Sequence, residues 1–254
     1  MDGTRKFSGL ADVYARGRPS YAEALLEALY TRYGFSERSV VGDIGSGTGK
    51  FARQLLDRGS FVYCVEPNGD MRAAAGRELA AYPNCRIVDG TAGSTTLADG
   101  SVDFVTAAQA FHWFDPRAFQ KECGRILKKE GKALLIWNMR GMTDPVNQAC
   151  FEIFRRYCPA FQGFGGGIQR DDIRIRQFFG GSYTYMEYEN PLCYDRVRFI
   201  SRSLSGSYSL RPGDKDYASY LEALTELFDR YARNKVLCIP NKTVAYMGRP
   251  GNGE

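Results

Sequence analysis

The sequence contains a single histidine, and its seven cysteines include no pair with C-x-x-C spacing. No apolar run approaches the length that crosses a bilayer, and residues 1–9 are polar, so we expect neither a membrane span nor a signal peptide. The cysteine number is odd, and Cys64 and Cys123 fall within apolar strand or helix patterns. We therefore expect reduced core cysteines in a cytoplasmic protein. The chain also has no internal repeat, no low-complexity segment and no long basic block, and we assign no metal-binding residue.

What is present is typical of a globular protein. The 254 residues are 44% hydrophobic and 25% charged, enough for one sizeable core or a core with a small lid. The net charge of +5 comes from 34 Lys and Arg against 29 Asp and Glu. This mild excess neither indicates nor excludes a nucleic-acid partner.

Residues 40–66 are the stretch around which the chain is organised. They begin V-V-G-D-I-G-S-G-T-G, an apolar run that ends in an acid and then in three glycines at alternate positions. Apolar residues at helical spacing follow, Gly59 ends that helix, and the run F-V-Y-C-V leads to Glu66. The pattern predicts strand, glycine loop, helix and buried parallel strand.

The residue types of this loop predict a nucleoside site. Glycines allow a sharp turn and the close approach of a ligand, and the loop opens a helix whose free N–H groups face the strand ends. Glu66 lies 17 residues after Gly49, at the end of the next strand, where an acid can accept hydrogen bonds from both ribose hydroxyls.

Two common nucleotide motifs do not match. A dinucleotide loop requires G-x-G-x-x-G, but counting from Gly45 the sixth position is Lys50. A P-loop requires a glycine at position 44 and Ser or Thr after Gly49-Lys50, and the chain has Ile44 and Phe51. An NAD-dependent oxidoreductase is therefore the weakest of the enzyme hypotheses.

The order D-x-G-x-G-x-G, which starts at Asp43, resembles motif I of the class I methyltransferases, which use S-adenosylmethionine. The resemblance implies that the glycine loop faces the methionine part of the cofactor and that Glu66 holds the ribose. The cofactor-binding residues of this loop would be Asp43, Gly45, Ser46, Gly47 and Gly49.

Two further patterns resemble the small-molecule methyltransferases related to trans-aconitate methyltransferase. Residues 7–21 match F-x-x-x-A-x-x-Y-x-x-x-R-P-x-Y, which implies that Tyr14 covers the cofactor and that Arg18 binds its carboxylate. A capping helix that only packs would show the same pattern. The second pattern is Q-A-F-H-W-F-D, at residues 109–115 after the predicted fourth strand.

The second pattern lies where an open α/β sheet binds its ligands. Gln109 and Ala110 would contact the cofactor, and Phe111, His112, Trp113 and Trp137 would contact the substrate. His112 is the catalytic candidate, as a base or as a hydrogen-bonding group; a structural role in fixing the loop is equally open.

The part of the sequence expected to bind the adenine departs from the family pattern. Pro67 and Met71 follow Glu66 and are candidate cofactor contacts; Met71 could touch the adenine or could equally be a core residue. Family members often carry an acid directly after the glycine that follows the third strand, but this chain has Thr91 after Gly90, with Asp89 before it. The backbone of Thr91 and Ala92 is left as the adenine contact.

The resemblance implies one α/β domain, with a doubly wound, mostly parallel seven-stranded Rossmann-like sheet, an antiparallel last strand and a helical lid insertion. We expect an N-terminal cap at residues 1–34, a core at about 35–139 and 180–248, and the lid at about 140–178; a flexible surface excursion there is the alternative. The Asp115-Pro116 pair should start a helix that Gly131 ends, and Asp214 should cap a long last helix.

The predicted reaction is methyl transfer from S-adenosylmethionine to a small molecule, with a carboxylate or hydroxyl oxygen as acceptor. A nucleic-acid or protein methyltransferase is less favoured. The chain lacks the Asn- or Asp-Pro-Pro-Phe/Tyr sequence of DNA amino-methyltransferases after the fourth strand, and the nearest following cysteine, Cys123, lies on a helix face. A non-catalytic cofactor-binding module stays open. The acceptor and the oligomeric state are not determined by the sequence.

Overall fold

A computed structural model describes residues 19–164, 168–206 and 208–251. The elements of the sheet and its two helical layers are α2 (Glu23–Arg32), β1 (Val40–Ile44), α3 (Lys50–Leu56), β2 (Phe61–Val65), α4 (Gly69–Glu78), β3 (Cys85–Val88), β4 (Val102–Ala108), the 3₁₀ turn η2 (Phe111–Trp113), α5 (Pro116–Ile126), β5 (Leu127–Met139), α7 (Ile173–Phe178), β6 (Thr184–Glu189) and β9 (Lys242–Gly248). The remaining elements are α6 (Pro145–Tyr157), β7 (Leu192–Tyr194), α8 (Arg196–Leu204), α9 (Tyr217–Tyr231) and β8 (Leu237–Ile239).

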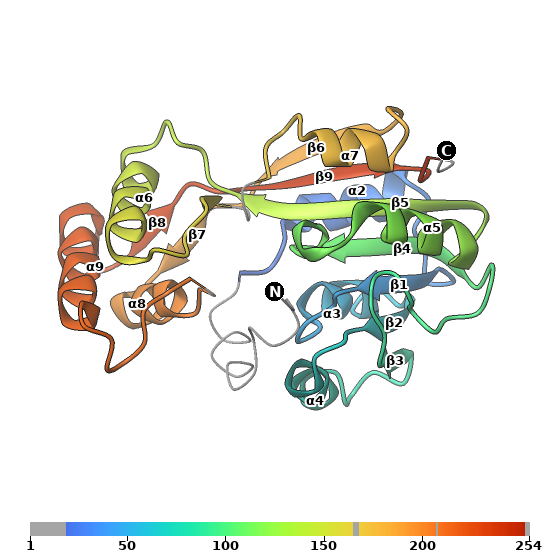
Figure 1. Ribbon diagram of the computed structural model, residues 1–254, viewed down its shortest axis with the longest axis horizontal. Helices are drawn as coiled ribbons and strands as arrows, with labels where there is room; N and C mark the ends of the chain where they lie inside the picture. Colours follow the sequence, from blue (N-terminus) through green and yellow to red (C-terminus); the bar gives the residue numbers. More distant parts are fainter. Residues whose placement is uncertain (1–18, 165–167, 207, 252–254) are drawn as a thin grey trace.

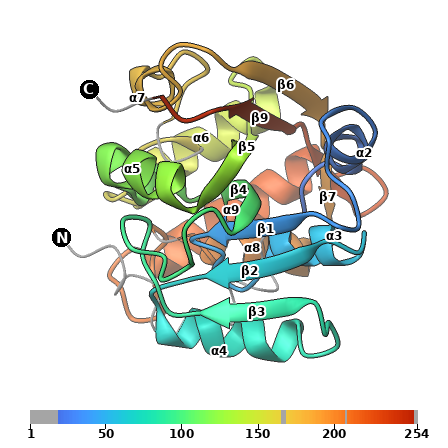
Figure 2. The same ribbon diagram turned by 90° about the vertical axis from the view of Figure 1, so that its right-hand side faces the viewer.

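The seven strands of the main sheet lie in the order β3-β2-β1-β4-β5-β9-β6 (Figures 1 and 2). The first five are parallel, and β9 runs antiparallel to both β5 and β6. The predicted α/β fold with an antiparallel last strand is thus confirmed. The strand order reverses between β1 and β4, which places the ends of both strands at a crevice where such sheets bind ligands.

Both faces of the sheet are covered, which explains why its central strands contain long apolar runs. Helices α2 and α3 pack on one face, and α5 and α7 pack on the other (Figure 2). Leu25, Leu29 and Leu55 are fully buried on the first face, and Phe119 and Ile175 are fully buried on the second. An unbroken apolar strand is the sequence signature of this two-sided burial.

A separate helical unit lies beyond the carboxyl end of the sheet (Figure 1). It consists of α6, α8 and α9 with the short pair β7 and β8, and it has its own apolar cluster, in which Phe154, Tyr220 and Leu224 are buried. This unit differs from the insertion expected at residues 140–178. It also draws on residues 192–239, whereas α7 of the expected insertion packs on the sheet.

A polar network joins the helical unit to the sheet. The Asn138 side-chain oxygen accepts hydrogen bonds from the Thr243 hydroxyl at 2.6 Å and from the Asn190 amide at 3.1 Å. The backbone N–H of Asn190 in turn donates to the carbonyl of Asn241 at 2.8 Å. The two chain segments that connect β6 to β7 and β8 to β9 are therefore fixed to each other and to the end of β5.

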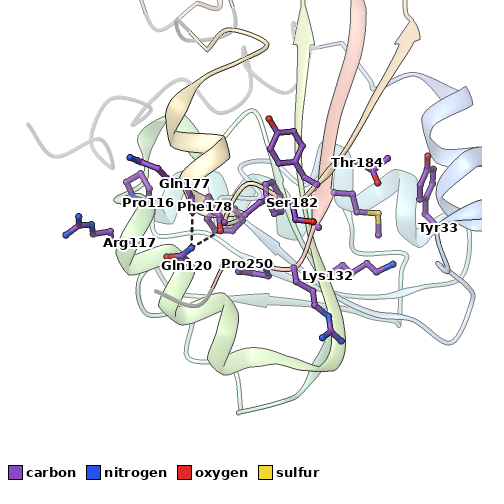
Figure 3. A pocket seen from close by; sticks show the side chains of 17 residues that line it. Tyr33, Pro116, Arg117, Gln120, Lys132, Gln177, Phe178, Ser182, Thr184 and Pro250 are labelled. Atoms are coloured by element: carbon purple, nitrogen blue, oxygen red, sulfur yellow. Dashed lines mark hydrogen bonds between the residues drawn. The ribbon is translucent and has the colours of Figure 1, made fainter. Parts of the chain in front are cut away.

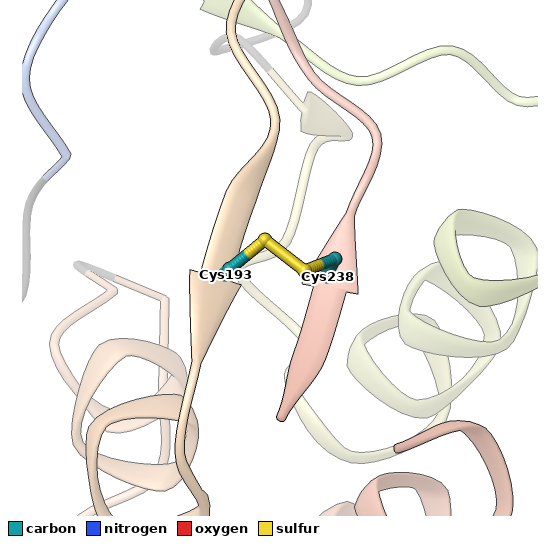
Figure 4. The surroundings of a disulfide bond; sticks show 2 residues. All are labelled: Cys193 and Cys238. Atoms are coloured by element: carbon teal, nitrogen blue, oxygen red, sulfur yellow. A yellow bond between two sulfur atoms is a disulfide. The ribbon is translucent and has the colours of Figure 1, made fainter. Parts of the chain in front are cut away.

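A disulfide between Cys193 and Cys238 lies just beyond this network (Figure 4). The two residues face each other across β7 and β8, and the antiparallel register brings their Cα atoms to 4.0 Å. The expectation that all seven cysteines are reduced is thus wrong for this pair. Sequence spacing could not show it, because the two residues are 45 positions apart.

Two expected boundaries are also wrong. Helix α5 ends at Ile126, and Gly131 lies inside β5, where the pairing with β4 shifts its register. A Cβ at Gly131 would lie 3.0 Å from the Asp103 carbonyl, so this glycine allows a close strand contact. Asp214 accepts a hydrogen bond from the Arg211 N–H at 2.6 Å within a turn, and α9 begins only at Tyr217.

Candidate functional site

The three glycines of the loop after β1 have different tasks. All three adopt positive φ angles, of 69° at Gly45, 57° at Gly47 and 79° at Gly49. A Cβ at Gly45 would lie 2.8 Å from the Ala110 Cβ, and one at Gly49 would lie 2.6 Å from a Leu79 methyl, so these two glycines allow close packing. A Cβ at Gly47 would meet nothing within 4 Å. Gly47 therefore marks the open side of the loop, which a ligand can approach.

Glu66 is positioned against this open side. Its carboxylate is buried and accepts hydrogen bonds from the Gly47 N–H at 2.9 Å and from the Asn68 N–H at 3.0 Å. Burial raises the pKa of Glu66, and the two backbone hydrogen bonds oppose that shift. A carboxylate has about four acceptor positions, so its oxygens retain capacity for the hydroxyls of a ribose.

Asp43 lies at the end of β1, buried beneath the loop. Its carboxyl accepts a hydrogen bond from the Thr106 hydroxyl at 2.7 Å. Burial raises the pKa of Asp43 to about 7, and the hydrogen bond from Thr106 only partly opposes this effect. Asp43 therefore gains or loses a proton near neutral pH.

The adenine end differs from the common arrangement. Arg72 of α4 donates two hydrogen bonds to the Asp89 carboxylate, at 3.0 and 2.8 Å, and a third to the carbonyl of Glu66 at 2.9 Å. The Thr91 N–H donates to the Ser94 carbonyl at 2.9 Å within the following turn. The Asp89 carboxylate is thus paired with Arg72, and the Thr91 N–H already donates a hydrogen bond within its own turn.

The other residues expected at this end lie close by. Pro67 and Met71 flank the start of α4, and the Met71 side chain is buried. Gly90 lies so close to Val65 and the Thr95 carbonyl that a Cβ would clash with both, and Ala92 packs on the core. None of these four residues lines the cavity described next.

A cavity of about 260 Å³ extends from the glycine loop to the helical unit. It is lined by Ser46 and Gly47 of the loop and by Gln109 and His112, which follow β4. Gln109 adopts a left-handed conformation with φ 55°, and its side-chain amide donates to the Asn138 carbonyl at 3.1 Å. Such a strained conformation in a non-glycine residue is typical of functional sites.

His112 and Trp113 form the wall of this cavity beside the loop. Their ring centroids are 4.9 Å apart, and 44% of Trp113 is exposed, at the cavity mouth. The Nδ1 atom of His112 accepts a hydrogen bond from the Trp137 indole N–H at 3.4 Å.

The expected substrate contacts at Phe111 and Trp137 are not supported by their positions. Phe111 is 1% exposed and packs edge-on against Trp137 and Phe178, and Trp137 is fully buried. Neither lines the cavity. In a stretch with four aromatic or imidazole rings among seven residues, sequence could not tell which rings turn inward. Tyr14 and Arg18 lie outside the described residues.

Sequence reasoning missed the arginines of the cavity. Arg140 follows β5, Arg174 lies on α7 and Arg202 lies on α8, and all three line the cavity. Arg174 forms an ion pair with Asp172 at 2.7 Å. Arg140 forms no ion pair with any residue that the structure describes. Its Nη1 atom is buried without a hydrogen-bond partner there, and its guanidinium lies 4.9 Å from the Phe164 ring. The position of Arg140 directly after a strand was the one feature of the sequence that could have indicated its place in the cavity.

A larger cavity, of about 990 Å³, lies along the outer edge of the sheet (Figure 3). It runs beside α5, α7 and the end of β9, where the Gln120 amide donates to the Phe178 carbonyl at 2.8 Å. None of the glycine-loop residues line it. The smaller cavity is therefore the candidate site, because it contains the loop and the ends of β1 and β4.

The residues of this site suit S-adenosylmethionine. The Ser46 hydroxyl is buried without a hydrogen-bond partner among the residues the structure describes, the space beside Gly47 is open, and Glu66 can hold a ribose. Within the same residues there is no cluster of three His, Cys, Asp or Glu side chains that could hold a metal ion. No helix in the described part of the chain is long and apolar enough to cross a membrane.

Comparisons with known proteins show the family of the chain. A family described as "Methyltransferase domain" matches residues 42–135. The chain is 32% identical over 235 residues to an uncharacterised methyltransferase-like protein of Schizosaccharomyces pombe, covering 92% of this chain and 91% of the relative. It is 37% identical over 139 residues to an uncharacterised methyltransferase of Mycobacterium bovis, a match that covers 55% of this chain and 54% of that relative.

The chain therefore spans about half the length of the mycobacterial relatives it matches. The YcgJ protein of Bacillus subtilis shares the fold, with a TM-score of 0.56 at 20% identity over 91% of this chain and 100% of that structure. Sequence identity with the yeast relative over nearly the whole chain, the sheet order and the glycine loop lead to the same assignment. The chain belongs to the class I S-adenosylmethionine-dependent methyltransferases.

Proposed function

We propose that the protein transfers a methyl group from S-adenosylmethionine to an oxygen of a small molecule, with a carboxylate or a hydroxyl as the acceptor. The observation that carries this proposal is one cavity that joins the glycine loop to His112 and to three arginines, Arg140 after β5, Arg174 on α7 and Arg202 on α8. A volume of about 260 Å³ suits a small acceptor better than a nucleic-acid strand or a folded protein.

In this proposal the cofactor is held by the ends of β1, β2 and β4. Glu66 binds the ribose, Gly47 and Ser46 contact the methionine part, and Gln109 and Ala110 form the neighbouring wall. The full set of cofactor residues is Tyr14, Arg18, Asp43, Gly45, Ser46, Gly47, Gly49, Glu66, Pro67, Met71, Gly90, Thr91, Ala92, Gln109 and Ala110. The bound cofactor supplies a methyl group on a positively charged sulfur, which is already strongly electrophilic.

The work left to the protein is alignment and the exclusion of water. The helical unit, which includes most of the insertion proposed as a lid, covers the cavity with Gln162 and Phe164. His112 and Trp113 form the wall between this lid and the loop. Within the family, the patterns at residues 7–21 and 109–115 support a place near the trans-aconitate methyltransferase-like group.

The first test is a calorimetric titration with S-adenosylhomocysteine. We expect saturable binding that Glu66→Ala weakens at least tenfold, because a buried carboxylate that binds two hydroxyls is lost. Glu152→Ala, an exposed acid on α6 paired with Arg155, is the matched control and should bind like the wild type. NAD is the control ligand and should not bind.

Absence of S-adenosylhomocysteine binding to a folded sample would refute the proposal. Binding without turnover of any acceptor would favour the non-catalytic module. The cytoplasmic location stays a prediction, and the Cys193–Cys238 disulfide is the observation that argues against it.

A further inference from the structure

We infer that His112 acts as a hydrogen-bond donor held in one tautomer by Trp137, and that the acceptor it serves is already an anion when it binds. This inference rests on the proposed methyl transfer and decides between its two acceptor chemistries. The observation behind it is the contact from the Trp137 indole N–H to His112 Nδ1, at 3.4 Å.

Trp137 is a fixed donor. It is fully buried on β5, with ring contacts to Phe111 at 6.2 Å and to Tyr246 at 6.0 Å between centroids. Close packing on both sides prevents the indole from turning, and its N–H can only donate. The Trp137 N–H therefore always faces the His112 ring.

The chemistry of imidazole then assigns the proton. An atom that accepts a hydrogen bond from Trp137 has a free lone pair, so Nδ1 of His112 carries no hydrogen. In neutral imidazole one nitrogen donates and the other accepts, and the hydrogen must be on Nε2. His112 can offer an N–H from Nε2 to a ligand, but Nε2 cannot remove a proton from one. Nδ1, the basic nitrogen, is occupied by Trp137.

Among the described residues that line the cavity, Asp43 is the only other group whose pKa would suit a base, and its position argues against that role. Asp43 is the one acid in the described lining; it lies under the glycine loop, and the Thr106 hydroxyl already bonds to it. The other titratable side chains there are the phenols Tyr21 and Tyr208 and the cations Lys50, Arg140, Arg174 and Arg202. None of these is an ordinary proton acceptor at neutral pH.

A pre-ionised oxygen, such as a carboxylate, fits this set of donors. The carboxylate contributes the electron pair of the new oxygen–carbon bond, and the pair of the broken carbon–sulfur bond stays on sulfur. The negative charge of the acceptor and the positive charge of the sulfonium cancel, so no proton is released. Arg140, which has no ion pair with a described residue, can hold a second anionic group of the same acceptor.

The tautomer can be measured directly because His112 is the only histidine of the chain. Long-range ¹H–¹⁵N correlation spectra of tag-free protein, near pH 8 with S-adenosylhomocysteine, should show one imidazole protonated at Nε2 only. Trp137→Phe should introduce the Nδ1-protonated form while S-adenosylhomocysteine binding persists. A wild-type imidazole protonated at Nδ1 would overturn the inference, whether or not the protein is an active methyltransferase.

Turnover provides the second test, with saturated dicarboxylic acids of three to six carbons as acceptors and the matching diols as controls. Gln places an amide N–H close to the position of Nε2 but cannot act as a base. We expect His112→Gln to stay within roughly fivefold of wild-type kcat and His112→Ala to lose about 100-fold, as for one preorganised donor. Equal losses in both variants, or turnover of diols but not of dicarboxylates, would contradict the donor role.

The role of Trp137 is tested by a double-mutant cycle. Trp137→Phe should lower kcat in the wild type but not further in His112→Gln, because its effect passes through the imidazole. A purely structural cost of the smaller side chain would appear equally in both backgrounds. For dicarboxylates we expect the pH dependence of kcat/KM between about pH 6 and pH 9 to be the same in the wild type and in His112→Gln, whereas a base at residue 112 would give the wild type a loss of activity below its pKa that the Gln variant lacks.

Discussion

Replacing Asp43 by Asn should change how the stability of the protein depends on pH. Asp43 is 1% exposed, and burial raises its pKa from 3.8 to about 7. Between these two values only the folded state binds the proton. The free energy of unfolding of the wild type therefore decreases as the pH rises through this window and is constant, as far as Asp43 is concerned, above about pH 7.

The size of the effect follows from the width of the window. One pKa unit corresponds to about 1.4 kcal/mol, so the two units between pH 5 and pH 7 correspond to about 3 kcal/mol. The introduced asparagine does not titrate, and its amide resembles the protonated carboxyl in shape and in its ability to bond with Thr106. The free energy of unfolding of Asp43→Asn should match that of the wild type to within about 1 kcal/mol at pH 5 and should exceed it by about 3 kcal/mol at pH 8.

The assay is urea unfolding at pH 5, 6, 7 and 8, with free energies extrapolated to water. Asp115→Asn is the control, because Asp115 is exposed and Asn is an equally good helix N-cap. A difference between Asp43→Asn and the wild type that stays constant across this range would refute the reasoning. It would mean that Asp43 is ionised in the folded protein at pH 5.

Two further predictions concern the glycine loop and the disulfide. Gly47→Ala should cost only the roughly 1 kcal/mol of its positive φ but weaken S-adenosylhomocysteine binding, because its Cβ would occupy the open side of the loop. Gly49→Ala should carry the same backbone cost and, in addition, a steric cost of similar size, because its Cβ would lie 2.6 Å from a Leu79 methyl. Equal unfolding free energies for the two variants would contradict the packing role given to Gly49. Cys193→Ser with Cys238→Ser should destabilise the helical unit by up to about 4 kcal/mol, since the bond closes a loop of 45 residues. Proteolysis of α8 and α9, with and without reductant, measures this loss, and identical cleavage rates would argue against a bond in solution.

Much of the fold followed from local patterns. The apolar strand runs, the glycine loop and the Asp-Pro helix starts predicted β1 to β5 and their helices, because two-sided burial and helix capping act on neighbouring residues. Glu66 was identified by its distance from the loop, and the structure places its carboxylate 2.9 Å from the Gly47 N–H. These features depend on short stretches of chain.

The helical unit was less predictable. Its residues, 145–157 and 192–239, are separated in the chain by α7 and β6, which belong to the sheet. Periodicity showed that α8 and α9 are amphipathic but not which apolar surface they face. For the same reason the partners Cys193 and Cys238 were not recognised, because their proximity depends on the pairing of two three-residue strands.

The sequence by itself determined five strands and their helices, the glycine loop and the position of the acid proposed to bind the ribose, because each depends on local spacing along the chain. The tertiary structure alone decided the chemistry of the cavity. It turned Phe111 and Trp137 into the core and brought Arg140 and Arg202 to one cavity. It also placed an indole N–H on one nitrogen of His112. Such contacts join residues far apart in the chain, and only the pairing of the strands and the packing of the helices on them fix their distance and direction.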